Sequence, residues 1–160
     1  ALTPRAHAIE CRIYAEDPDR GFMPAPGVVR AISTPSGPGI RDDRGVAAGF
    51  EIPVFYDSMI AKLVVWGDSR PEAIARLRRA LDEYRVVGVK TTTPFFQWLT
   101  QQDDFLQGRF DTTYLDNLLK TRQGQVFAMA DAATERAAIA AVALMSWFRA
   151  HRAVTGAGGV

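Results

Sequence analysis

Arg41 stands at the exit of a stretch rich in proline and glycine, Pro35-Ser36-Gly37-Pro38-Gly39-Ile40-Arg41. This composition predicts a tightly turned loop, so that the side chain at its end is held in a defined direction. A guanidinium is planar and keeps its proton at any physiological pH. It therefore suits a site that binds an anion, or one where negative charge develops during a reaction. The alternative is an ordinary surface arginine that follows a turn.

A second candidate stretch covers residues 53–62 and contains the run Tyr56-Asp57-Ser58-Met59. Two roles are open to Asp57. Its carboxylate would either orient Arg41 from behind or cap the turn into the next strand, and we favour the turn. Lys62 is expected to be a charge at the edge of the site rather than a catalytic base.

Several familiar kinds of site are missing from the sequence. It contains no G-x-x-x-x-G-K-[ST] phosphate-binding loop. The two histidines, His7 and His151, are far apart and have no cysteine or carboxylate at the spacing of metal ligands. They also provide no convincing Ser-His-Asp set. We therefore predict no metal-binding residues, and the chain taken alone does not resemble a complete enzyme.

The composition narrows the class of protein. The 160 residues are 48% hydrophobic and 23% charged, as in a typical globular domain. A net charge of +1 with dispersed basic residues provides no field for nucleic acid or membrane, so we expect neither as a partner. Cys11 is the only cysteine, which excludes an internal disulfide and fits a reducing compartment such as the cytoplasm. The apolar segment 137–148 is too short to span a bilayer.

The hydrophobic pattern predicts strands first. Alternation favours strands over residues 7–14 and 28–33, with a short strand near Ile40 and Arg41. Residues 58–66 are apolar on both faces, so this strand is expected to be central. Residues 17–27 contain several prolines and glycines and are expected to form a loop.

The period then lengthens to that of a helix. Ser69 and Glu72 form a capping box around Pro71, and the helix is expected to end near Arg85. Its buried stripe and its solvent-side ion pairs follow from spacings of three and four. The stripe is Ile74, Leu77, Leu81 and Tyr84, and the pairs are Arg78 with Asp82 and Arg79 with Glu83.

Further helices are predicted over residues 95–101 and 113–120, followed by an alanine-rich helix over 130–150 and a Gly-rich tail. Strands followed by helices predict an α+β fold, with a mostly antiparallel sheet and helices packed against it. We place a domain at residues 1–122. Residues 123–160 are expected to be a helical extension and flexible tail leading towards a further domain.

The motifs resemble the C-terminal domain of biotin carboxylase in order and spacing. They are the two stretches around Arg41 and Asp57, the run His7-Ala8-Ile9-Glu10-Cys11-Arg12-Ile13-Tyr14-Ala15-Glu16-Asp17-Pro18, and Phe22-Met23-Pro24-Ala25-Pro26-Gly27. The resemblance extends over about residues 7–119 and implies the same α+β architecture. It is closest to the carboxylase component of acetyl-CoA or propionyl-CoA carboxylases. Pyruvate and methylcrotonyl carboxylases share the motifs, so the final acceptor stays open.

The resemblance implies a division of labour. In this family an ATP-grasp body binds ATP and magnesium and turns bicarbonate into carboxyphosphate, which breaks down to CO2 and phosphate. The phosphate deprotonates biotin, and the biotin enolate attacks CO2. Arg41 is then the catalytic and substrate-binding residue, contacting bicarbonate and the ureido oxygen of biotin. Asp42 stands where the family commonly has an aromatic residue and is a candidate to pair with Arg41. The chain by itself is expected to be inactive.

The resemblance also implies partners. Trp66 and Arg70 match an aromatic residue and an arginine at the family's dimer interface, while the alternative for Trp66 is that it closes the core. Glu10 and Arg12 are expected to form a cross-strand ion pair or to contact the ATP-grasp body. Other expected partners are a biotin carboxyl carrier domain and a carboxyltransferase component, in the cytoplasm, or in the mitochondrial matrix of a eukaryote. A competing interpretation is a non-catalytic dimerisation module. The tail domain of another ATP-grasp ligase fits the Tyr56–Met59 run poorly.

Overall fold

The computed structural model describes residues 5–122, 124–127 and 140–148. The chain divides into two compact units, Ala1–Phe127 and Ala128–Val160. In the second unit residues 140–148 are helical, within the helix that the sequence predicts over 130–150. The rest of that helix and the predicted tail lie outside the described residues.

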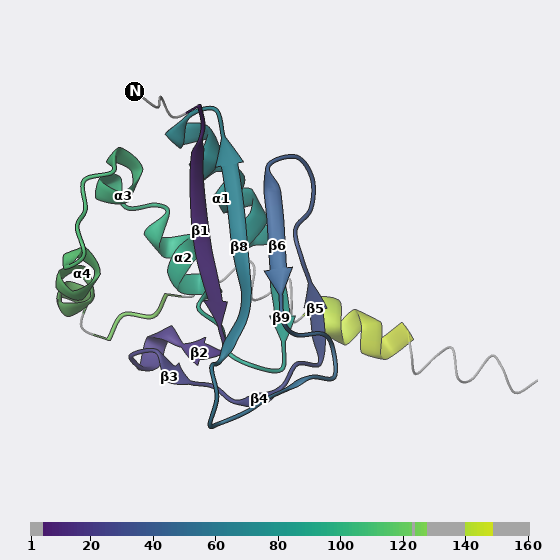
Figure 1. The fold of residues 1–160 in the computed structure, drawn as a ribbon. Coiled ribbons are helices and arrows are strands. Elements are labelled where there is room, and N and C mark those ends of the chain that lie inside the picture. Colours follow the sequence, from purple (N-terminus) through teal and green to yellow (C-terminus); the bar gives the residue numbers. More distant parts are fainter. Residues whose placement is uncertain (1–4, 123, 128–139, 149–160) are drawn as a thin grey trace, which may run out of the picture. The chain divides into compact units, whose positions relative to one another are not determined.

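The first unit is built on a three-stranded antiparallel sheet. Its strands are β1 (His7–Tyr14), β8 (Met59–Gly67) and β6 (Ile40–Arg44), and β8 lies in the centre as predicted (Figure 1). All strand pairs in the described chain are antiparallel. Alternate side chains of each strand point to opposite faces, so the two faces of this sheet differ in composition.

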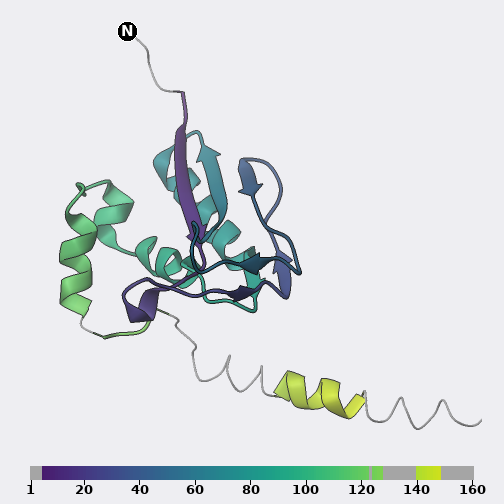
Figure 2. The same cartoon turned by 60° about the horizontal axis from the view of Figure 1, so that its bottom comes forward.

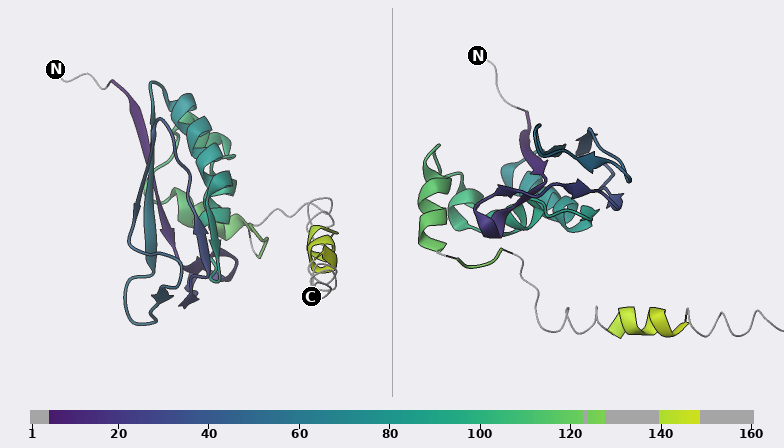
Figure 3. Two further views of the ribbon diagram at one scale, coloured as in Figure 1. Left: turned by 90° about the vertical axis from the view of Figure 1, so that its right-hand side faces the viewer. Right: turned by 90° about the horizontal axis from the view of Figure 1, so that it is seen from below.

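Helix α1 (Arg70–Glu83) covers one face of the sheet, as the left view of Figure 3 shows. The Ser69 Oγ accepts a hydrogen bond from the Glu72 backbone N–H, which confirms the predicted N-terminal cap, although the Glu72 carboxylate reaches back to Asp68 rather than to Ser69. The predicted stripe is buried against the sheet. The fully buried residues at this contact include Ile13, Ile60, Leu63, Val65, Leu77 and Leu81.

Short strands tie the long loops together. The strand predicted over residues 28–33 is broken into β4 (Gly27–Val28) and β5 (Ala31–Ser33). The reason is a change of partner: β4 pairs with β7 (Glu51–Ile52), whereas β5 pairs with β9 (Arg85–Val87). The predicted loop over 17–27 holds a small hairpin of β2 (Glu16–Asp17) and β3 (Met23–Pro24), with the 3-10 turn η1 (Pro18–Arg20) between its strands.

Three helices lie on the β1 side of the first unit (Figure 2): α2 (Thr93–Leu99), α3 (Asp103–Gln107) and α4 (Tyr114–Arg122). They surround a second cluster centred on Phe95, Leu99 and Phe127. The Phe127 ring packs edge-on against Phe95 at 5.5 Å, and its backbone N–H donates to Asp19 at 2.7 Å. These contacts hold residues 124–127 in the first unit, whereas the sequence placed its boundary after Arg122.

The first unit is therefore an α+β fold with an antiparallel sheet and packed helices, which confirms the predicted class. Within the described ranges, no helix combines the length and apolar character that a membrane crossing requires.

Candidate functional site

The face of the sheet opposite α1 carries the charged residues of the candidate motifs. Because register partners in antiparallel strands point to the same side, two rows cross this face. One row is Glu10, Val64 and Arg41, and the next is Arg12, Lys62 and Asp43. Trp66, which pairs with Ala8, continues the face beyond the first row. We call these residues, together with Ala8, the open face. In Figure 1 it is the side towards the viewer, with α1 behind the sheet.

The turn before β6 has the tight geometry that the sequence predicts. Gly37 and Gly39 adopt φ angles of 112° and 75°, in the region that favours glycine. The Ile40 N–H donates to the Gly37 carbonyl at 3.2 Å, and the Gly39 carbonyl accepts from the Trp66 N–H at 3.0 Å. These bonds fix the end of the loop to β8. Arg41 follows immediately, and its side chain is 69% exposed on the open face.

Arg41 is paired with Asp43, not with Asp42. The Arg41 Nε donates to Asp43 Oδ1 at 2.9 Å, and Nη2 lies 2.8 Å from Oδ2. This contact holds the pKa of Asp43 below its usual value and raises that of Arg41. The prediction of an Arg41–Asp42 pair was wrong because neighbours on a strand point to opposite faces, whereas residues two apart share one.

Asp42 points towards α1 instead. Its carboxylate lies 2.9 Å from the Arg44 guanidinium and accepts a hydrogen bond from the Tyr84 hydroxyl at 3.1 Å. Burial raises the pKa of Asp42 and outweighs the opposing effects of Tyr84 and Arg44. The pKa of Tyr84 is also raised, by burial and by the nearby Asp42 charge. Two consecutive carboxylates thus serve different faces of the sheet.

Glu10 and Arg12 form an ion pair at 3.1 Å within β1. The prediction of a cross-strand pair was therefore wrong, since both residues lie on one strand and on one face. Both side chains remain partly exposed on the open face.

Asp57 lies in the turn before β8, where its Oδ1 accepts a hydrogen bond from the Met59 N–H at 3.0 Å. This is the geometry of a carboxylate that closes a turn. Among the described residues, no hydrogen bond or ion pair joins Asp57 to Arg41. The side chains before it are strongly exposed, with Phe55 at 91% and Tyr56 at 82%.

Trp66 and Arg70 have different surroundings. Trp66 is 45% exposed on the open face and belongs to neither hydrophobic cluster of the described chain. Arg70 points to α3, where it donates to the backbone carbonyls of Leu106 and Phe105. Its guanidinium also lies 5.3 Å from the Phe105 ring centroid and 5.6 Å from that of Phe110. Arg70 therefore holds α3 against the start of α1.

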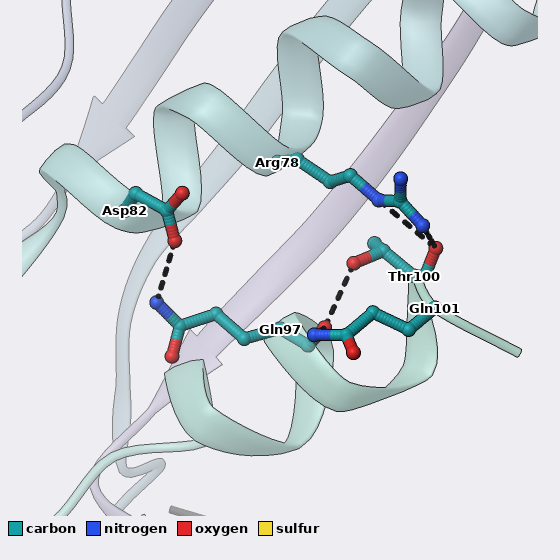
Figure 4. Close-up of a pocket in the computed structure, with 5 residues that line it drawn as sticks. All are labelled: Arg78, Asp82, Gln97, Thr100 and Gln101. Atoms are coloured by element: carbon teal, nitrogen blue, oxygen red, sulfur yellow. Dashed lines mark hydrogen bonds between the residues drawn. The ribbon is translucent and has the colours of Figure 1, made fainter. Parts of the chain in front are cut away.

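Figure 4 shows a polar pocket of about 400 Å³ between α1 and α2. Arg78 donates to the Thr100 carbonyl at the end of α2, and the Gln97 amide donates to Asp82 at 3.1 Å. The predicted Arg78–Asp82 pair was thus wrong, because each side chain binds α2, whereas the predicted Arg79–Glu83 pair is present at 2.8 Å. The polar groups around this pocket bind one another, so it is a seam between two helices rather than a substrate site.

Other chemistry is sparse in the described parts of the chain. Cys11 is buried, and burial raises the pKa of its thiol to about 12, so it is not a reactive thiolate. No group of three His, Cys, Asp or Glu side chains in those parts could hold a metal ion. A pocket of about 510 Å³ beside the ends of β6 and β8 is lined in part by Asp43 and Lys62.

Comparisons with known proteins agree with the motifs. The profile of the biotin carboxylase C-terminal domain family matches residues 10–117. Biotin carboxylase of a Nostoc species is 47% identical over 116 residues, covering 72% of this chain and 26% of that protein. A pyruvate carboxylase component from Methanothermobacter thermautotrophicus is 51% identical over 112 residues, covering 70% and 23%.

A solved structure is also similar. The biotin carboxylase domain dimer of Hydrogenobacter thermophilus 2-oxoglutarate carboxylase, in complex with MgADP, ADP and bicarbonate, aligns with a TM-score of 0.70 at 42% identity. The alignment covers 78% of this chain and 26% of that one. The chain thus spans about a quarter of the length of the relatives it matches.

Proposed function

The chain belongs to the biotin carboxylase C-terminal domain family, and on that premise we propose that it forms the C-terminal part of a biotin carboxylase. The whole enzyme would use ATP and bicarbonate to carboxylate biotin on a carrier. MgATP is assigned to an ATP-grasp body outside this chain, and the described residues offer no competing cluster of metal ligands. By itself the chain would be inactive.

Arg41 is the residue of this chain that would act in the reaction. One observation carries this proposal: at the end of a glycine-braced turn, the guanidinium is exposed on the open face with one edge held and the other unengaged. Such an edge would bind bicarbonate and then the ureido oxygen of biotin. That oxygen is neutral in biotin and negative in the enolate, so its bond to Arg41 would strengthen towards the transition state.

Replacing Arg41 in the complete carboxylase tests this role. We expect Arg41→Ala to lower kcat for biotin carboxylation by roughly 10²–10³-fold, the scale for losing one preorganised donor. Arg41→Lys should recover only part of the loss, because an ammonium lacks the planar fork. The measurement is steady-state kinetics with biotin, bicarbonate and ATP varied separately, and the KM for ATP should change little. A near-normal kcat in Arg41→Ala would leave the domain a structural or dimerisation module.

The finer assignments follow the same premise. The carboxylase would serve an acyl-CoA carboxylase, with a biotin carboxyl carrier domain and a carboxyltransferase as partners, in the cytoplasm or a mitochondrial matrix. The names of the relatives keep pyruvate and 2-oxoglutarate open as acceptors. Trp66 is proposed for a homodimer interface because its indole is exposed, with Arg70 bracing the neighbouring helix end. Residues 123–160 would lead towards a further domain.

A further inference from the structure

We propose that Asp43 is a positioning residue for Arg41. It holds the Nε/Nη2 edge of the guanidinium, so that the opposite edge is presented to the anion. This inference rests on the proposed function, since it specifies how the arginine is aimed at its substrate.

The geometry of the pair leaves room for both anions. A guanidinium has five N–H donors in one plane, and Asp43 engages the edge formed by Nε and Nη2 at 2.9 and 2.8 Å. No other hydrogen bond or ion pair to Arg41 exists among the described residues. The Nη1 donors and the second Nη2 donor therefore remain available for a planar, two-oxygen ligand such as bicarbonate. Asp43 and the ligand would occupy different edges rather than compete for one.

The charges nearby keep the site attractive to anions despite Asp43. Lys62 is the register partner of Asp43 on β8, and Arg12 is the partner of Lys62 on β1. With Arg41, these cations outnumber the two carboxylates of the open face, Glu10 and Asp43. Arg41 and, to a lesser degree, Lys62 hold the pKa of Asp43 low, so its carboxylate stays ionised near neutral pH. The clamp is thus permanent, while the face remains net positive.

The clamp matters because Arg41 has little else to hold it. Its side chain is 69% exposed, and a long exposed side chain samples many rotamers. Two charge-assisted bonds to a residue on the same strand, two positions along, select one orientation. Orientation of this kind lowers a barrier because the donor need not be ordered when the substrate reacts.

The kinetic test uses Asp43→Asn in the complete carboxylase. We expect kcat for biotin carboxylation to fall by about tenfold, less than for Arg41→Ala, because the donor is kept but no longer aimed. The KM for ATP should not change. Asp42→Asn is the matched control: it removes the same charge one residue away, from a side chain that faces α1. An unchanged or raised kcat in Asp43→Asn would overturn the proposal, as would an equal loss in the control.

A double-mutant cycle separates this inference from the proposed function. In an Arg41→Ala background, Asp43→Asn should cause no further loss, because the residue it positions is gone. A second tenfold loss there would mean that Asp43 acts independently, and would overturn the inference. If Arg41→Ala itself leaves kcat unchanged, the proposed function fails instead.

The clamp itself can be measured on this chain without any turnover. The Arg41 Nε–H should exchange with water severalfold faster in Asp43→Asn than in the parent or in Asp42→Asn, as followed by NMR of the arginine side chains. Equal exchange rates in all three proteins would show that Asp43 does not hold the guanidinium, whatever the outcome of the kinetics.

Discussion

The two faces of the three-stranded sheet are made by the same strands but serve different ends. On the face under α1, Ile13, Leu63 and Val65 have no measurable exposure, and they pack against the helix. On the open face, Arg41, Asp43 and Trp66 are partly or largely exposed, and no helix of the first unit covers them in the described residues. One strand can therefore hold the fold together with every second residue and present reactive groups with the others.

The largest expected effect tests this division on β8, where adjacent residues face opposite ways. Leu63→Ala should cost about 2–5 kcal/mol of unfolding free energy, because it opens a cavity against α1. Val64→Ala, one residue along on the open face, is the matched control and should cost about 1 kcal/mol or less. Urea unfolding of this chain compares the two. Equal costs would mean that the open face is buried in solution and that the contrast between the faces is false.

A smaller effect is expected from Trp66 on the open face. Trp66→Asp should leave the chain folded and weaken its self-association by tenfold or more, the effect of losing about 1.4 kcal/mol at an interface. Sedimentation gives the association, and far-UV circular dichroism reports folding. Phe55→Asp, which adds the same charge at an exposed aromatic residue on a loop, is the control. A folded Trp66→Asp protein with the parent's mass would discard the interface, and an unfolded one would place the indole in the core.

Local signals predicted the elements that position these faces. The alternation in β1, the doubly apolar β8 and the Ser69–Glu72 cap each depend on neighbours in sequence, and the structure confirms them. The elements that sequence missed depend on distant partners. Residues 28–33 split into two strands because β7 and β9 compete for them. Helix α3 is only five residues long and is braced by Arg70, so it has no periodic signal of its own.

The candidate site was predictable in part for the same reason. The proline and glycine around Arg41 mark it as a held side chain, and the open face bears the charged residues of the motifs. The partner of Arg41 was missed because sequence distance favours Asp42, whereas the strand brings Asp43 to the same face. Applying the two-residue period of the strand to Arg41 itself would have found it. The roles of Arg41, Asp57, Trp66 and Arg70 stay predictions.

The smallest expected effect is a difference in acidity between Asp42 and Asp43. Burial raises the pKa of Asp42 above its ordinary value of 3.8, whereas the hydrogen bond from Arg41 lowers the pKa of Asp43 below it. The stability that Asp43 contributes is present above pH 3.8 and is lost as the pH falls through its folded pKa. Asp42 acts in the opposite sense: the folded state takes up its proton first, so stability rises as the pH falls through the folded pKa towards 3.8.

Carboxyl chemical shifts recorded against pH would measure both groups in this chain, with Asp42→Asn and Asp43→Asn to assign the signals. Asp42 should titrate above pH 3.8 and Asp43 below it. In urea unfolding, Asp42→Asn should remove the component of stability that rises towards acid, and Asp43→Asn the component that falls. If both carboxylates titrated on the same side of 3.8, the two residues would share one environment, and the strand would not separate a packed face from an open one.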